Sequence, residues 1–368
     1  MDLQKKESIQ FPLTDQNIYK CASKIRNGEV VIFPTETVYG MGASSMNKEA
    51  IKQIYAIKRR PLNNPLIMHV LNWSAAKIYT SVSSAEEDII TELTDKFWPG
   101  PLTILVKKSK YVSDIVSGGT DWVSIRCPSG SIARKLIEYS MVPIVAPSAN
   151  ISGKITSTYK DHVIRYFNDT RVSILIDPEP CSIGVESTIL KIDGTHISIV
   201  RPGIITMEHI KTCLSTEKYS HLQFEICSIS EQVEHPGSEI SHYSTDKKTM
   251  LFNFIDTQFA KEAKVDTSIT ESLSKSIDFY LTQSACIDFN NKNFHCRDKF
   301  GAYVDLSENG SVEEALFNLY NVLHQLNHTE VVNILIFDFW SDKEGLYKTM
   351  FDRIFRCCNG NKIVIPIS

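Results

Sequence analysis

Residues 30–70 read VVIFPTETVYGMGASSMNKEAIKQIYAIKRRPLNNPLIMHV, and the rest of the chain is organised around this stretch. The β-branched run at 30–33 predicts a buried strand that ends at Pro34. A turn rich in hydroxyl groups follows, and apolar residues at near-helical spacing over 48–58 predict a helix. A second strand is expected at 66–70. The stretch therefore predicts strand, turn, helix and strand in succession.

Three consecutive cations, Lys58, Arg59 and Arg60, stand where this helix ends, beside a proline and two asparagines. Arginine grips phosphate or carboxylate through two parallel hydrogen bonds, and lysine acts as a mobile point charge. The segment suits an anion-binding cradle for that reason. Cations also complement the negative end of a helix dipole, so a solvated helix end explains the same charges. Charge alone leaves both interpretations open.

The pair PTETVYG (34–40) and KRRPLNNPLIMHV (58–70) resembles the signature of the YrdC-like family, the threonylcarbamoyl-AMP synthases. The resemblance continues in order through WPGPLT (98–103), VSIR (123–126), PSANISG (147–153), GVEST (184–188) and RPG (201–203), and on to a His-Tyr pair at 242–243. It implies an α/β protein of the family's long form. The expected domains are a YrdC-like twisted mixed sheet with helices around a concave site (1–212), a linker covering the active site (213–245), and a smaller Rossmann-like α/β domain (246–368).

The motifs also carry chemistry of their own. PSANISG places hydroxyls, an amide and a glycine within seven residues, which suits phosphate or ribose oxygens, although a loop built from Asx and Ser turns fits it as well. Three arginines, Arg60, Arg126 and Arg201, stand close to prolines at segment ends. Interleaved with the hydroxyl-rich turns, they indicate convergence on one polyanionic ligand.

The resemblance implies a reaction and a set of residues. Threonine captures bicarbonate as a carbamate, which attacks the α-phosphorus of ATP and releases pyrophosphate, and a separate transferase carries the product to tRNAs reading ANN codons. ATP is thus a substrate, with Mg²⁺ held mainly by phosphates. The threonine site would comprise Thr37, His69, Arg126, Ala146 through its backbone, and Ser187, with Arg126 pairing with the carboxylate. The ATP site would comprise Lys58, Arg60, Asn64, Ser148, Asn150, Thr156, Arg201 and Tyr243, of which Lys58 and Arg60 would be catalytic, stabilising the transferring phosphate.

One position departs from the family pattern. Trp122 stands where the family usually has a threonine at the start of the strand that leads to Arg126. Either a hydroxyl contact to the nucleotide is lost, or an aromatic ring stacks on the base in its place.

Chain length, net charge and cysteine content limit the number of domains, the class of ligand and the cellular location that can be expected. A chain of 368 residues predicts two domains, and its net charge of −4 disfavours an extended nucleic-acid interface. The start of the sequence has no apolar segment typical of a secretory signal, and no apolar run approaches the ~20 residues of a membrane span. Nine scattered cysteines without a CxxC pair indicate reduced thiols and no zinc site. A cytoplasmic location without membrane contact is expected.

Two other functional classes fit the sequence less well. A non-enzymatic RNA- or nucleotide-binding module is disfavoured by the net negative charge and by the lack of basic residues interleaved with aromatic ones. A carbamoyl-phosphate enzyme of the hydrogenase-maturation type would bring zinc-finger cysteine pairs, which are absent from the sequence. No Walker P-loop and no complete GxGxxG occurs, so an ATP site must be of another kind.

Periodicity and capping residues predict the remaining elements. Helices are expected at 15–28, 73–94 and 129–139, and after a capping box at Ser311. Buried strands are expected at 102–106, 249–256 and 332–337. Strands and helices that alternate in the last third of the chain predict a mostly parallel sheet there.

Overall fold

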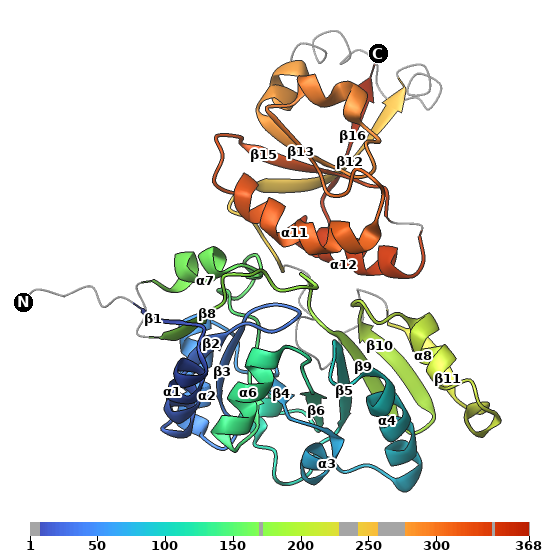
Figure 1. The fold of residues 1–368 in the computed structure, drawn as a ribbon. Helices are drawn as coiled ribbons and strands as arrows, with labels where there is room; N and C mark the ends of the chain where they lie inside the picture. The colour runs from blue at the N-terminus through green and yellow to red at the C-terminus, as the bar shows by residue number, and fades with distance from the viewer. Residues whose placement is uncertain (1–7, 169–171, 228–241, 257–276, 341–342, 368) are drawn as a thin grey trace, which may run out of the picture. The chain divides into compact units, whose positions relative to one another are not determined.

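The computed structural model describes residues 8–168, 172–227, 242–256, 277–340 and 343–367. Contacts divide the chain into two compact units: the first comprises residues 1–152 and 156–238, the second 153–155 and 239–368 (Figure 1). The prediction of two α/β domains is confirmed.

One mixed sheet of eleven strands forms the frame of the first unit. Its strands lie in the order β1 (Ile9–Pro12), β8 (Ser173–Ile176), β2 (Val31–Phe33), β3 (Gly40–Ser44), β7 (Ile144–Val145), β4 (Ile67–His69), β6 (Trp122–Arg126), β5 (Leu102–Lys107), β9 (Thr188–Asp193), β10 (His196–Arg201) and β11 (Gln223–Ile226). β11 pairs with β10 in parallel, so the chain remains in this sheet as far as Ile226.

The helices of the first unit cover the sheet in two groups. They are α1 (Asp15–Arg26), α2 (Lys48–Lys58), α3 (Trp73–Ala76), η1 (Lys77–Tyr79), α4 (Ser84–Phe97), α5 (Asp114–Ser117), α6 (Ser131–Ser140), α7 (Lys160–Phe167), α8 (Met207–Cys213) and η2 (Glu217–Tyr219). Side chains alternate between the two faces of a strand. Val31 and Phe33 of β2 accordingly share a core with α1 and α6, which lie side by side in Figure 1. Ile32 faces the larger core with α2 and α4.

Local sequence explains where α2 begins and ends. The Asn47 side chain accepts a hydrogen bond from the backbone N–H of Ala50, which caps the first turn. Arg59 takes a left-handed conformation with φ 53° and ends the helix two residues before Pro61. The single helix predicted over 73–94 is wrong, because the chain breaks at 80–83 and Ser83 with Glu86 forms a capping box that starts α4.

The second unit is a five-stranded parallel sheet in the order β14 (Ala302–Asp305), β13 (Ser284–Asp288), β15 (Asn333–Phe337), β12 (Lys248–Asp256) and β16 (Lys362–Ile367). Its helices include η4 (Phe294–Lys299), α11 (Val312–Leu326) and α12 (Leu346–Cys357), with α11 and α12 in contact, and residues 277–282 are also helical. The expectation of a parallel α/β domain is confirmed. Residues 228–241 of the predicted linker lie outside the described residues, so its cover of the active site stays a prediction.

No helix in the described part of the chain is long and apolar enough to cross a membrane.

Candidate active site

Strand register brings two of the three predicted arginines, Arg126 and Arg201, to one face of the large sheet. His69 of β4 pairs with Arg126 of β6, and Arg126 pairs with Thr103 of β5. Thr103 and Arg201 both pair with Ile189 of β9, from opposite sides. Residues in register point to the same face, and Arg201 joins them after a register shift between Ile199 and Arg201. This row, which we call the polar row, therefore runs across five strands. With strands ~4.8 Å apart, Arg126 and Arg201 lie about 14 Å from each other along it.

Arg126 is held from three sides. Its side chain forms an ion pair of 2.6 Å with Glu36, donates to Thr37 Oγ1 at 2.9 Å, and donates to the Gly100 carbonyl at 3.1 Å. Both partners of the ion pair are buried, with 4% and 7% of their side chains exposed. Burial by itself would raise the pKa of Glu36, but the charge of Arg126 and the N–H of Ser129 outweigh it and lower the pKa to about 2. Glu36 therefore fixes the guanidinium beside Thr37.

His69 stays neutral next to this ion pair. Burial and the positive charge of Arg126 lower its pKa to about 3. Its side chain is 4% exposed, and Nδ1 finds no hydrogen-bond partner among the described residues. A neutral imidazole can donate or accept one hydrogen bond at that nitrogen.

The far end of the polar row is a hydrogen-bonded cluster around Ser187. Its hydroxyl lies 2.8 Å from Thr103 Oγ1 and accepts from Arg201 Nη2 at 3.0 Å. The Ser187 carbonyl accepts from Arg201 Nε and Nη2 at 3.1 and 2.9 Å. Ser187 and Arg201, predicted to bind threonine and ATP respectively, are thus in direct contact.

Lys58, at the end of α2, reaches the PSANISG loop. Its Nζ donates to the carbonyls of Ser148 at 2.6 Å and Asn150 at 2.5 Å, and 1% of the residue is exposed. Burial and then the positive charge of Arg60 hold the pKa of Lys58 well below its ordinary value. The loop itself is braced by a bond of 2.6 Å from Ser148 Oγ to Asn150 Oδ1. The cationic segment and the PSANISG turn therefore form one substructure.

Arg60 and Asn64 form a second buried pair. Arg60 donates through Nε to the Asn64 carbonyl at 3.1 Å and through Nη2 to the Asn64 side chain and to the Pro65 carbonyl. Arg60 is 8% exposed and Asn64 is 6% exposed. The interpretation of this segment as a solvated helix end is thus wrong for Lys58 and Arg60, since both are buried and bonded.

The remaining predicted residues lie in different surroundings. Thr156 Oγ1 donates to Glu186 at 2.7 Å. The N–H of Ala146 is used by the Ile67 carbonyl at 2.9 Å, so of its backbone only the carbonyl is left to serve a ligand. Tyr243 belongs to the second unit, where its ring lies 5.2 Å from that of Tyr320.

Sequence reasoning missed four polar groups. Glu36 and Glu186 are buried carboxylates that bond predicted site residues, and Thr103 bridges toward Ser187. Ser124 lies between Trp122 and Arg126 on the same face of β6, and its hydroxyl has no partner among the described residues. Glu36 lies inside PTETVYG, and an acidic residue within this hydroxyl-rich turn is the sequence feature that could have identified it as a site residue.

Trp122 is part of a small apolar cluster rather than an open ring. It is 5% exposed and packs with Leu105, Ile189 and Val200 on the face that carries the polar row. The Nζ atoms of Lys107 and Lys191 each lie 4.0 Å from its ring centroid. The ring therefore fills space at the edge of the site, and both of the roles considered for position 122 stay untested.

Two family profiles together span most of the chain. Residues 23–203 match the family described as "Telomere recombination", and residues 205–358 match "Threonylcarbamoyl-AMP synthase, C-terminal domain".

Individual relatives agree with these matches. A Pyrococcus abyssi protein named threonylcarbamoyl-AMP synthase is 32% identical over 357 residues, covering 97% of this chain and 98% of its own length. A Bacillus subtilis protein of the same name is 39% identical over 236 residues, covering 64% of this chain and 66% of its own. The crystal structure of P. abyssi Sua5 complexed with L-threonine aligns with a TM-score of 0.78 at 28% identity, over 98% of this chain and 99% of that one.

Proposed function

This chain belongs to the threonylcarbamoyl-AMP synthase family, and we propose that its first unit holds the reacting groups along the polar row and the PSANISG loop. The enzyme makes threonylcarbamoyl-adenylate from L-threonine, bicarbonate and ATP and serves the threonylcarbamoyl modification of tRNA. The observation that carries the assignment of roles is the register that aligns His69, Arg126 and Arg201 on one buried face.

Threonine is assigned to the end of the polar row at Arg126. A guanidinium fixed by Glu36 offers parallel N–H donors to a carboxylate, while Thr37 and neutral His69 offer partners for the amine or the hydroxyl. The relative from P. abyssi has been solved with L-threonine, which supports a threonine site in this fold. Removal of water at such a buried face also strengthens the pairing of charges.

The triphosphate is assigned to Lys58, Arg60 and Arg201. Among the described residues the Lys58 amine has only carbonyl partners, so a phosphate oxygen would supply a counter-charge and raise the pKa of the amine. Asn64, Ser148, Asn150, Thr156 and Tyr243 complete the proposed ATP contacts. The cations would stabilise charge that develops on the transferring phosphate and on pyrophosphate.

The chemical step depends on the protein positioning the carbamate and ATP, and it needs no covalent intermediate with a protein side chain. Threonine's amine gains CO₂ from bicarbonate with loss of water, one carbamate oxygen bonds to the α-phosphorus, and the bond to pyrophosphate breaks. The described residues contain no group of three or more His, Cys, Asp or Glu side chains that could hold a metal. We assign Mg²⁺, which neutralises phosphate charge, to the phosphate oxygens themselves. Transfer of the product to a separate tRNA-modifying enzyme in the cytoplasm belongs to the same proposal.

Pyrophosphate release tests this function. The purified chain would be incubated with ATP, Mg²⁺ and bicarbonate, with and without L-threonine, beside a Lys58→Ala/Arg60→Ala variant and a control that loses the exposed Lys20 and Lys96. We expect release that depends on both threonine and bicarbonate, that falls at least about 100-fold in the site variant, and that stays unchanged in the control. Release that ignores threonine, or that survives in the site variant, would overturn the assignment.

A further inference from the structure

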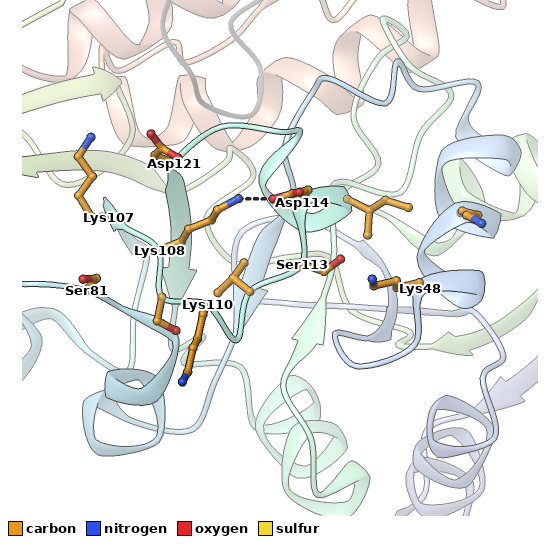
Figure 2. A pocket seen from close by; sticks show the side chains of 12 residues that line it. Lys48, Ser81, Lys107, Lys108, Lys110, Ser113, Asp114 and Asp121 are labelled. Atoms are coloured by element: carbon orange, nitrogen blue, oxygen red, sulfur yellow. Dashed lines mark hydrogen bonds and ion pairs between the residues drawn. The ribbon is translucent and has the colours of Figure 1, made fainter.

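We propose that a second anion site, separate from the polar row, binds the phosphate groups of a polyanion in a lysine-lined pocket on the first unit. The pocket has a volume of about 870 Å³ and is lined by Lys48, Lys52, Lys107, Lys108 and Lys110, which we call the lysine pocket (Figure 2). The lysines come from the first turns of α2, from the end of β5 (Lys107) and from the segment that follows β5. The proposal does not depend on the function assigned above.

Two of the lysines stand where helix electrostatics disfavour them. Lys48 is the first residue of α2, at the positive end of the helix dipole, and Lys52 follows one turn later with the same charge. Glu49 pairs with Lys52 at 2.8 Å and relieves part of this repulsion. A bound anion would relieve the rest, because it would meet the dipole and both ammonium groups together.

Two others are held in place. Lys108 donates to Asp114 at 2.6 Å (Figure 2). It also donates to Ser117 Oγ at 2.9 Å, and 15% of its side chain is exposed. Lys107 lies over the Trp122 ring at 4.0 Å. Two cations that are already ordered lose less conformational entropy on binding a ligand than two mobile ones would.

The lining chemistry favours phosphate over a nucleobase. Two hydroxyls, from Ser81 and Ser113, stand among the lysines and can donate to phosphate oxygens, whereas the hydroxyl of Ser109 donates to the Ile78 carbonyl at 2.7 Å. No aromatic side chain is among the lining residues, so the pocket offers no ring on which a base could stack. Asp114 and Asp121 also line it, and they leave the lysines in excess.

The location of the lysine pocket and the charge around it indicate a site that is separate from the polar row. Lys107 lies four residues along β5 from Thr103, which places it about 13 Å from the polar row. The net charge of −4 is unevenly distributed: the first unit, residues 1–152 and 156–238, holds 25 lysines and arginines against 25 acids, whereas the second unit holds 14 against 18. The negative surplus therefore lies in the second unit, and the lysines of the pocket are a local concentration of positive charge on a unit that is neutral as a whole.

The experiment compares two variants of equal charge. Lys48→Gln/Lys52→Gln/Lys110→Gln removes three exposed lysines from the pocket, and Lys20→Gln/Lys96→Gln/Lys211→Gln removes three exposed lysines elsewhere on the unit. The full chain and both variants would be titrated with a fluorescent oligouridylate and, by calorimetry, with tripolyphosphate, over a range of KCl concentrations. Pyrophosphate release is measured for all three and is expected to be the same.

We expect the pocket variant alone to bind at least about 10-fold more weakly at 0.1 M salt. For oligouridylate, its slope of log K against log salt should be shallower by about 2, since three phosphate contacts contribute about 0.7 each. Loss of oligouridylate binding assigns the site to an RNA backbone, and loss confined to tripolyphosphate assigns it to a free polyphosphate. Equal binding by the two variants, or no binding of either probe to the full chain, would overturn the proposal.

Discussion

Replacing Glu36 with glutamine should expose how the threonine end of the site is built. The substitution keeps the shape of the side chain and removes its charge, so Arg126 loses its buried ion-pair partner. The N–H of Ser129, which donates to Glu36 at 2.9 Å, can still bond to the amide oxygen. The change therefore isolates the charge of one carboxylate from its packing.

The loss of folding stability expected for Glu36→Gln follows from the pKa of Glu36. A carboxyl that titrates near 4.5 in the unfolded chain and at about 2 in the folded protein stabilises the fold by about 3 kcal/mol at pH 7, at ~1.4 kcal/mol for each tenfold change in proton affinity. Breaking a buried ion pair by removing one partner costs about 3–5 kcal/mol, which is the same order.

The lowered pKa of Glu36 also predicts the direction in which the stability of the fold changes with pH. Because folding depresses the pKa, the stabilisation is complete above pH 4.5 and is lost as pH falls toward 2. The difference in free energy of unfolding between wild type and Glu36→Gln should thus be about 3 kcal/mol at pH 7 and roughly half of that at pH 3.

Urea unfolding of the full chain, monitored by circular dichroism between pH 3 and 7, measures this difference in free energy of unfolding. Glu29→Gln is the matched control, since Glu29 pairs with Lys24 at 2.7 Å with half of its side chain exposed and should contribute less than about 1 kcal/mol. A variant as stable as wild type, or a loss that does not change with pH, would refute the reasoning.

Three further substitutions probe neighbouring groups. Thr103→Val removes the hydroxyl that contacts Ser187, so we expect a loss of about 1 kcal/mol in urea unfolding, and no loss would contradict the bond of 2.8 Å. Ser124→Ala removes a buried hydroxyl that has no partner among the described residues, so the free energy of unfolding should stay equal or rise by up to ~1 kcal/mol; a clear decrease would contradict this. Trp122→Thr empties the apolar cluster and should cost about 3–5 kcal/mol, measured as a lower Tm, and a wild-type Tm would argue against a packing role.

Local sequence signals account for much of the fold. The apolar periodicity over 48–58 and the cap at Asn47 place α2 where the structure has it. The same kind of signal shows why the helix predicted over 73–94 fails: Ser83 and Glu86 form a capping box inside that range, and a start signal in the middle of a helix marks two helices.

The arrangement of the site could be predicted only in part. Arg126 and Arg201 stand near prolines at segment ends, which suggested convergence, yet their common face depends on β5 and β9 lying between β6 and β10. Such strand order is set by contacts between distant parts of the chain, which no local pattern encodes. The ion pair of Glu36 with Arg126 joins positions 90 residues apart and was missed for the same reason.

Calorimetric titration with L-threonine tests the central claim, that Arg126 binds the substrate carboxylate. The informative variant is Glu36→Gln/Arg126→Gln, because replacing both members of a buried ion pair leaves no uncompensated charge and preserves the fold. We predict that this double variant unfolds cooperatively in urea and binds threonine at least about 100-fold more weakly than wild type, while Glu36→Gln alone keeps Arg126 and stays within about tenfold. Threonine binding at wild-type affinity by the folded double variant would contradict the account.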